Sequence, residues 1–203
     1  MHPKNLIVAI VLGLALAAGV FVALRTQVPA APEHALVLPD PNPVPEFALL
    51  DQRGDDVDQS VFKGQWDLVF FGFTHCPDIC PTTLQVLAAA RAALAAKGQE
   101  PLPRIVLVSV DPERDTPEIM GRYVDYFGAG NLGLTGSLEE VSKLTTGLGI
   151  YFEKQPPDGD NYVVDHSAAV LLIDPDGGFH ALFSGPHVID YYVHDLPIIM
   201  AGK

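Results

Sequence analysis

The sequence has little cysteine and little positive charge, and each shortage excludes a class of site or partner. Two cysteines among 203 residues cannot form the four-cysteine cage of a structural zinc ion or an iron–sulfur cluster. The C-x-x-C-H signature of covalent haem attachment is also missing. Lysines and arginines number 12 against 25 aspartates and glutamates, a formal net charge of −13. Because such a surface repels phosphates, we expect no nucleic-acid partner.

Charge is also missing from one long stretch near the N-terminus. Residues 6–24 read LIVAIVLGLALAAGVFVAL, and as a helix they would span about 28 Å, close to the thickness of the bilayer hydrocarbon. Ala15-Leu16-Ala17 resembles the cleavage site of a signal peptide, which is the alternative. The apolar run continues beyond Ala17, however, so we predict an uncleaved single-pass anchor over residues 1–24. Whether residues 1–24 are an anchor or a cleaved signal peptide, we expect the rest of the chain to lie outside the cytoplasm.

Residues 25–45 contain six prolines and little periodicity. Such composition favours an extended polyproline II conformation, which would reach roughly 60 Å from the membrane. We therefore predict that residues 25–45 are a proline-rich linker and that residues 46–203 form one folded domain, a size that can bury a core without disulfides.

Beyond the linker, predicted strands and helices alternate. Strands are expected at residues 47–50, 68–73, 104–110, 163–173 and 179–183. Helices are expected at residues 81–97, 117–127, 137–146 and 188–196, the third opened by a Ser137–Glu140 capping box and the last closed by Pro197. This order predicts an α/β fold whose sheet is partly parallel and has helices on both faces. Ligands of such sheets bind beyond the carboxyl ends of the strands, where the cysteines lie.

The two cysteines stand in FGFTHCPDICP, residues 71–81, between a buried strand and a helix start. The spacing of Cys76 and Cys80, i and i+4, places both sulfurs on one face of a helical turn. A helix N-terminus stabilises thiolates, and soft thiolates select Cu(I) over hard cations. Two thiolates would make most of a copper site, and one neutral imidazole would complete it.

Seven histidines are available for that position. His2 precedes the predicted anchor and His34 lies in the predicted linker, so both are set aside. His75 is expected to tune the thiolate or to line the mouth of the site, and His194 to lie on a helix surface. His166 is the strongest candidate, because it begins a strand where a thioredoxin-like fold brings a loop against the cysteine-bearing turn. Its neighbour Asp165 could support it or add a weak ligand to Cu(II).

Three segments carry a resemblance to a known family. FGFTHCPDICPTTL, VSVDPERDTPE and YVVDHS, in this order and spacing, resemble the Sco/SenC family of copper chaperones for cytochrome c oxidase assembly. The similarity runs from about Phe47 to the C-terminus. It implies a thioredoxin-like fold preceded by one transmembrane helix, with Cys76, Cys80 and His166 as the ligands of copper, as Cu(I) and also as Cu(II).

The resemblance also implies partners and a location. The acceptor would be the dinuclear copper site of cytochrome c oxidase subunit II, with a periplasmic copper donor and a thioredoxin-like reductant as further partners. The protein would lie in the bacterial inner membrane, with its soluble domain in the periplasm. When oxidised, Cys76 and Cys80 would form a disulfide that abolishes copper binding.

Other readings of the same residues stay open. The main alternative to a non-enzymatic metallochaperone is a thiol–disulfide oxidoreductase that reduces the copper-ligand cysteines of the oxidase. A thiol peroxidase would need only one reactive thiolate. A purely structural disulfide would close too small a ring to stabilise a domain of this size by much. Dependence on His166 separates the first two readings, because a metal site needs this ligand and a dithiol reductase does not.

Overall fold

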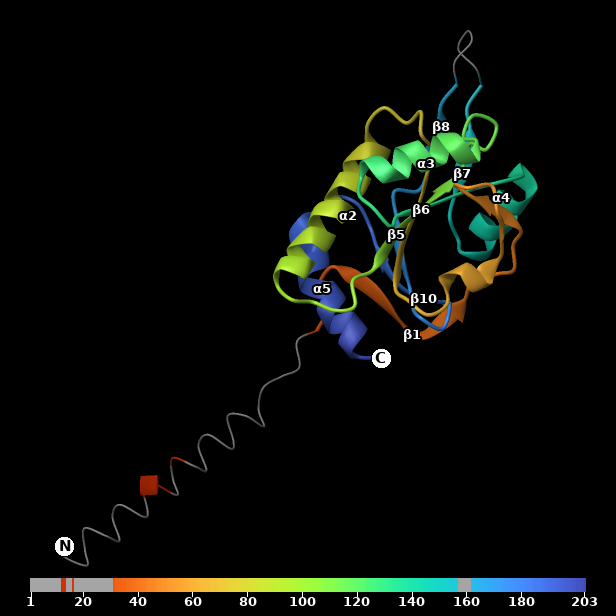
Figure 1. Cartoon of the computed structure of the whole chain (residues 1–203). Helices are drawn as coiled ribbons and strands as arrows, with labels where there is room; N and C mark the ends of the chain where they lie inside the picture. The colour runs from red at the N-terminus through yellow and green to blue at the C-terminus, as the bar shows by residue number, and fades with distance from the viewer. Residues whose placement is uncertain (1–11, 14–15, 17–30, 157–161) are drawn as a thin grey trace, which may run out of the picture. The chain divides into compact units, whose positions relative to one another are not determined.

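The computed structural model describes residues 12–13, 16, 31–156 and 162–203. Its strands are β1 (Ala35–Pro43), β2 (Leu49–Asp51), β3 (Asp56–Val57), β4 (Asp67–Gly72), β5 (Arg104–Ser109), β6 (Leu132–Thr135), β7 (Phe152–Lys154), β8 (Val164–His166), β9 (Val170–Ile173) and β10 (Gly178–Phe183). Its helices are the short 3-10 helix η1 (Gln59–Phe62) and the α-helices α2 (Ile79–Ala96), α3 (Pro117–Tyr126), α4 (Leu138–Gly147) and α5 (Ile189–Ala201) (Figure 1).

Two apolar runs form the centre of the sheet. β4 is buried at every position, and β5 is buried everywhere except at its first residue. The two strands pair in parallel, with Phe70 opposite Leu107. One charge is tolerated because it is paired: the buried Asp67 carboxylate accepts a hydrogen bond of 2.7 Å from Arg104. Burial nevertheless raises the pKa of Asp67 to about 6.

The main sheet has the strand order β1-β10-β9-β4-β5-β6-β2-β3. β4, β5 and β6 are parallel, and the remaining pairings are antiparallel. A separate two-stranded sheet joins β7 to β8. The architecture is the mixed α/β, thioredoxin-like fold expected from the sequence. The carboxyl ends of β4 and β5 meet at one edge, so the loops that follow them lie together.

Helices cover both faces of this sheet. α2 and α5 pack against each other on one side, and α4 lies on the other side (Figure 1). α3 packs over β6. The predicted caps hold at the starts of two helices: the Thr116 hydroxyl accepts a hydrogen bond from Ile119, and the Ser137 hydroxyl accepts one from Glu140. The reciprocal half of the capping box is wrong, because the Glu140 carboxylate accepts instead from the backbone of Ala48.

The last helix does not end where proline predicts. α5 continues through Pro197 to Ala201. Proline costs this helix one backbone hydrogen bond, but Leu196, Ile199 and Met200 are buried beyond or beside it. Burial of each such side chain is worth about 1.5–3 kcal/mol, enough to carry the helix past the interruption.

The proline-rich linker predicted for residues 25–45 is wrong over residues 35–43. These residues form β1, which pairs antiparallel with β10. Proline is compatible with a strand only at an edge or a bulge, and β1 satisfies both conditions: it is the outermost strand, and its register shifts between Val37 and Asn42. The compact unit accordingly begins at Pro32 rather than at residue 46.

The single strand expected over residues 163–173 is two strands in different sheets. β8 belongs to the two-stranded sheet, whereas β9 pairs with β4 and, as the predicted hairpin, with β10. Residues 167–169 connect the two strands. His166 is therefore held by the pairing of β8 with β7 and not by a strand of the main sheet.

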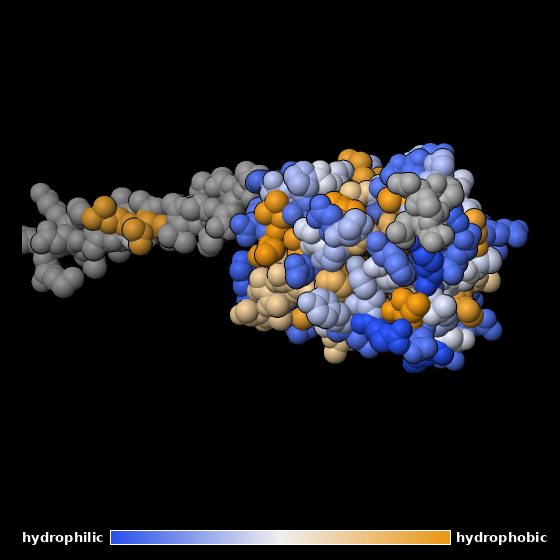
Figure 2. Space-filling view, turned by 90° about the horizontal axis from the view of Figure 1, so that it is seen from above, coloured by the Kyte–Doolittle hydropathy of each residue, from blue (hydrophilic) through white to orange (hydrophobic). Residues whose placement is uncertain are grey.

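Among the described residues, α2 is the one helix long and apolar enough to cross a membrane. Leu84, Leu87 and Leu94 are buried against the domain, so α2 is a core helix. The predicted anchor over residues 1–24 lies almost entirely outside the described residues. On the domain, the face seen from above carries separate apolar patches among hydrophilic residues (Figure 2).

Candidate metal site

The two cysteines are held at the junction of β4 and α2. Cys76 lies in the loop after β4, and Cys80 lies in the first turn of α2. The backbone N–H of Cys80 donates a hydrogen bond to Cys76 Sγ over 3.4 Å. Both cysteines are free; Cys80 is fully buried, whereas Cys76 keeps 9% of its surface exposed. The predicted i, i+4 arrangement therefore brings both sulfurs together, with only Cys76 reaching the surface.

His166, at the end of β8, faces the sulfurs across the fold. Its Nε2 lies 3.3 Å from Cys80 Sγ, and a ring nitrogen and the two sulfurs all lie within 4.8 Å of one another. Nδ1 is 3.1 Å from the carbonyl oxygen of Ser167. Since a carbonyl only accepts, Nδ1 carries the proton, and the lone pair of a neutral ring is left on Nε2, toward the sulfurs.

Close packing fixes the positions of these three donors. The rings of Phe70 and Phe73 meet the His166 ring edge-on at centroid distances of 5.7 and 5.8 Å. Gly72 lies so near Cys80 that a Cβ atom there would stand 2.8 Å from the sulfur. The sequence predicts these aromatic residues as core, which they are, but not their contact with the imidazole.

The two thiols have opposite electrostatic environments. The hydrogen bond from the Cys80 side chain, together with the backbone N–H groups of Asp78 and Cys80, lowers the pKa of Cys76 to about 5. The same contact with Cys76, together with burial, raises the pKa of Cys80. At neutral pH Cys76 is therefore the thiolate of the pair, and it is the group able to attack a disulfide or capture a soft metal ion.

An acidic side chain holds the cysteine-bearing loop. Asp115 is buried, and its carboxylate accepts hydrogen bonds from the backbone and hydroxyl of Thr74, at 3.0 and 2.6 Å, and from the hydroxyl of Ser109, at 2.7 Å. Thr74 is two residues before Cys76. Asp115 thus ties this loop to the end of β5.

A second acid, four residues earlier, holds the β7–β8 hairpin. The Tyr162 hydroxyl donates to Asp111 at 2.6 Å. The Arg114 guanidinium lies 3.7 Å from the Tyr162 ring centre, and Lys154 Nζ lies 3.9 Å from it. Lys154 also bonds Glu113 at 2.7 Å. We call Asp111, Arg114, Lys154 and Tyr162 the hairpin clamp. Asp111 and Asp115 both belong to the VDPERD segment, residues 110–115, and each of these buried acids holds one donor-bearing element.

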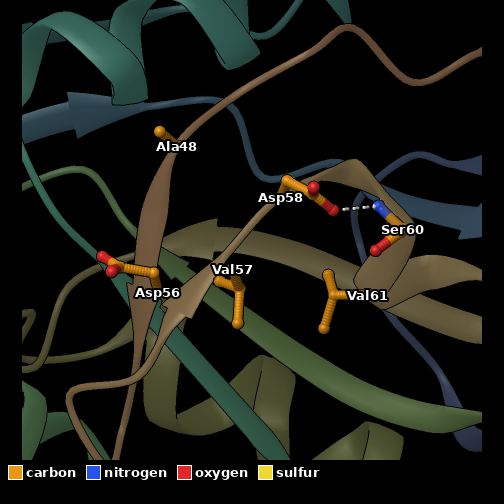
Figure 3. Close-up of a pocket in the computed structure, with 6 residues that line it drawn as sticks. All are labelled: Ala48, Asp56, Val57, Asp58, Ser60 and Val61. Carbon is orange, nitrogen blue, oxygen red and sulfur yellow. Dashed lines mark hydrogen bonds between the residues drawn. The ribbon is translucent and has the colours of Figure 1, made fainter.

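A cleft leads to Cys76 and His166. Cys76 and His166 line a cavity of about 260 Å³, together with Phe73 and Ile79. A larger cavity, of about 420 Å³, lies beside β3 and η1. Its two carboxylates, Asp56 and Asp58, point in different directions, and Asp58 accepts from the Ser60 backbone (Figure 3). These carboxylates do not converge on one point, whereas two sulfurs and one imidazole nitrogen converge at Cys76, Cys80 and His166. The candidate metal site is therefore the one at the cysteines.

The other sequence candidates lie outside this group of donors. His75 is half-exposed; its Nδ1 is 3.1 Å from the Thr74 hydroxyl and 3.8 Å from Asp115. Its proposed tuning of the thiolate stays a prediction. The Asp165 carboxylate accepts from Gln155 at 2.6 Å, so it supports the hairpin and does not belong to the converging set.

The donor set fits a soft metal ion. Two sulfurs and one imidazole nitrogen provide the low-coordinate environment that Cu(I) prefers. The same sulfurs, adjacent and free, can also pass between dithiol and disulfide. The arrangement therefore supports copper binding and thiol–disulfide exchange through the same atoms.

Sequence comparison connects this site to known proteins. A family model described as SCO1/SenC matches residues 38–200. A Stutzerimonas stutzeri protein whose name describes it as copper-binding is 37% identical over 170 residues, which is 84% of this chain and 83% of that protein. The mitochondrial SCO2 homolog of Homo sapiens is 46% identical over 135 residues, 66% of this chain and 51% of the relative. The chain thus spans about half the length of such mitochondrial relatives.

Solved structures agree with the sequence matches. Copper-bound ScoI of Arabidopsis thaliana has 34% sequence identity and a TM-score of 0.73, over 78% of this chain and 98% of that one. Apo Sco1 of Thermus thermophilus has 40% identity and a TM-score of 0.71, over 80% and 94% of the two chains. The family match over residues 38–200 includes the elements that carry the three donors.

Proposed function

Because this chain belongs to the SCO1/SenC family, we propose that it is a copper metallochaperone that binds copper through Cys76, Cys80 and His166. The convergence of two sulfurs and one imidazole nitrogen within 4.8 Å carries the proposal. Solved structures of relatives with copper bound, from Arabidopsis thaliana and yeast, support copper as the ion. In this proposal the copper is cargo, held for delivery.

The acceptor in this proposal is the dinuclear copper site of cytochrome c oxidase subunit II. Delivery would proceed by ligand exchange from the open side. Cys76 and His166 line the cleft, whereas Cys80 is fully buried. Incoming acceptor ligands would therefore meet Cys76 and His166 first, and Cys80 would be the last donor to release the ion.

The cellular setting belongs to the same proposal. The apolar run at residues 6–24 favours a single-pass anchor in the bacterial inner membrane, with the sheet domain in the periplasm. A periplasmic copper donor would load the site, and a thioredoxin-like reductant would keep Cys76 and Cys80 from closing into a disulfide. No enzymatic turnover is needed for this role.

One observation favours a second function, reduction of the acceptor's disulfide. Cys76 has the lowered pKa of an attacking thiolate, and the thiol of Cys80 stands beside it. Cys76 would attack the target disulfide to form a mixed disulfide. Cys80 would then attack Cys76, releasing the target as a dithiol while the pair becomes oxidised. Such a reaction uses no imidazole ligand, so it should survive the loss of His166.

Anaerobic titration of the reduced protein with Cu(I), against a competing chelator, tests the copper site. We expect one tightly bound Cu(I) per chain. Cys76→Ser, Cys80→Ser and His166→Ala should each weaken binding by more than the roughly 10–100-fold that loss of an outer partner costs. His75→Ala is the comparison variant: it removes a neighbouring imidazole outside the donor set, so it should weaken binding much less than loss of a donor.

Reduction of a model disulfide by the same variants separates the two functions. Tight copper binding that depends on all three residues supports the chaperone. A protein that binds no copper tightly, yet reduces the disulfide equally well with and without His166, would be an oxidoreductase.

A further inference from the structure

A buried carboxylate joins the two ends of the sheet domain. Asp195 of α5 is fully buried. Its oxygens accept hydrogen bonds from three consecutive backbone N–H groups just before and at the start of β1: Glu33 at 3.0 Å, His34 at 2.7 Å and Ala35 at 2.7 Å. The residues joined are about 160 positions apart in the chain. This fixes the backbone of residues 33–35 against the last helix.

The same junction brings together two histidines that the sequence sets aside separately. His34 and His194 lie with ring centroids 5.9 Å apart and their planes nearly perpendicular, at 75°. The His34 ring is stacked on Tyr191, at 3.9 Å and 15°. Tyr191 and His194 are three positions apart on α5, hence on one face of the helix. The orientation of each ring therefore depends on a defined neighbour.

Carboxylates surround the pair. His194 Nδ1 lies 2.6 Å from Asp195 Oδ1, and its Nε2 lies 4.0 Å from Glu33 Oε1. One ring nitrogen of His34, one of His194 and one oxygen of Asp195 all lie within 4.8 Å of one another. Exposed surface at His34 and His194 leaves room for water molecules.

We propose that His34, His194 and Asp195 form a second metal site, for a divalent transition-metal ion. Imidazole and carboxylate are borderline-to-hard donors, unlike the thiolates of the first site, and suit Cu²⁺ or Zn²⁺. By the Irving–Williams order Cu²⁺ binds more tightly than Zn²⁺. The ion replaces the proton between His194 and Asp195, and that proton is released to solvent. Glu33 stands at the rim as a further carboxylate.

The two sites are independent of each other. They share no residue, and β10 and β9 lie between β1 and β4. Cys76, Cys80 and His166 can therefore be removed without touching the proposed donors. An ion at the second site links the start of β1 to α5, so it also stabilises their association.

The test uses the full chain in mild detergent, carrying Cys76→Ser, Cys80→Ser and His166→Ala so that the first site is absent. Cu²⁺ is titrated, and electron paramagnetic resonance reads the nitrogen hyperfine pattern of bound copper. We expect one Cu²⁺ per chain, coordinated by two imidazole nitrogens. His34→Ala and His194→Ala should each weaken it at least about tenfold, since even outer partners of metals cost roughly 10–100-fold.

His75→Ala is the control, because it removes an exposed imidazole elsewhere, and it should leave the titration unchanged. Circular dichroism checks that the variants stay folded. Thermal unfolding gives a second readout: Cu²⁺ should raise the midpoint of the parent and not that of the two histidine variants. The proposed site would be wrong if Cu²⁺ bound equally tightly to the His34→Ala and His194→Ala variants. It would also be wrong if the electron paramagnetic resonance signal of bound Cu²⁺ lacked two nitrogen ligands. Because the first site is absent, neither outcome bears on the proposed chaperone function.

Discussion

Gly72, the last residue of β4, leaves just enough space for the sulfur of Cys80. A Cβ atom at this position would stand 2.8 Å from Cys80 Sγ and 3.0 Å from the Phe70 ring. Gly72→Ala should therefore displace the sulfur, lowering the free energy of unfolding by about 1–3 kcal/mol through overpacking. Copper affinity should fall about tenfold, as for other changes that shift a ligand. Urea unfolding and Cu(I) competition measure the two effects.

Gly121→Ala provides the matched control for this substitution. Gly121 lies in α3, and a Cβ there would meet Gln52 at an ordinary 3.4 Å. The helix should gain roughly 0.5–1 kcal/mol from losing a glycine, with copper affinity unchanged. Equal copper affinity in Gly72→Ala and the wild type would mean that the sulfur has room to move.

For single residues, the sequence predicted only those features of the site that depend on residues close together in the chain or on the family resemblance. The i, i+4 spacing predicts the adjacent sulfurs of Cys76 and Cys80, and the YVVDHS segment carries His166 by resemblance. The roles of Gly72 and Asp115 were not predictable, because each depends on a contact made by folding: with Cys80 in one case and with Thr74 in the other. Neither residue type by itself indicates such a contact.

At the scale of elements, the β7–β8 hairpin depends on the hairpin clamp. Tyr162→Phe removes the hydroxyl that donates to Asp111. A hydrogen bond to a charged group is worth up to about 1.5–3 kcal/mol, and partial exposure reduces this to about 1 kcal/mol here. His166 lies at the end of β8 in this hairpin, so a less firmly held hairpin positions the imidazole less well. We therefore expect the affinity for Cu(I) to fall severalfold although none of the three donors has changed. Competition with a chelator at neutral pH measures this affinity.

Tyr151→Phe is the comparison variant on the same hairpin. Its hydroxyl bonds Glu153 at the exposed surface, within the hairpin itself, so its loss should leave copper affinity unchanged. If both variants bound copper like the wild type, the hairpin would be held by its β7–β8 pairing and packing alone.

Elements were predicted well where the signal lay inside the segment. β4, β5 and the capped helices α3 and α4 follow from buried apolar runs and N-cap residues. Pro197 failed as a stop signal because the burial of Ile199 and Met200 against the domain outweighs one lost hydrogen bond. The split of residues 163–173 into β8 and β9 was not readable, because only tertiary pairing assigns the two strands to different sheets.

For the whole molecule, the position of β1 defines where the folded domain begins. A chain of residues 32–203 should fold fully, whereas a chain of residues 46–203 should be strongly destabilised. The shorter chain exposes the edge of β10 and leaves the buried Asp195 without its three backbone donors. The midpoint of thermal unfolding should fall by about 10 °C or more, equivalent to about 3 kcal/mol for a domain of this size. Scanning calorimetry of both chains measures this.

Similar midpoints for the two chains would contradict a structural role for β1 and restore the linker predicted for residues 25–45. That prediction rested on proline content, which favours extended backbone in a spacer and in an edge strand alike. The alternation of strands and helices was sufficient to predict the α/β class. It could not predict that residues 35–43 form a strand, because the partner of that strand, β10, lies at the other end of the sequence.

The proposed copper donors come from two separately paired parts of the fold, and this has a thermodynamic consequence. The sulfurs lie on the loop and helix that follow β4 of the main sheet, and the imidazole lies on the β7–β8 ribbon, so a bound ion would join the two. Linkage is reciprocal: the factor by which copper favours the docked ribbon equals the factor by which a docked ribbon favours copper. A partner that binds the undocked ribbon would therefore lower the affinity for the ion by the same factor, without contacting either sulfur.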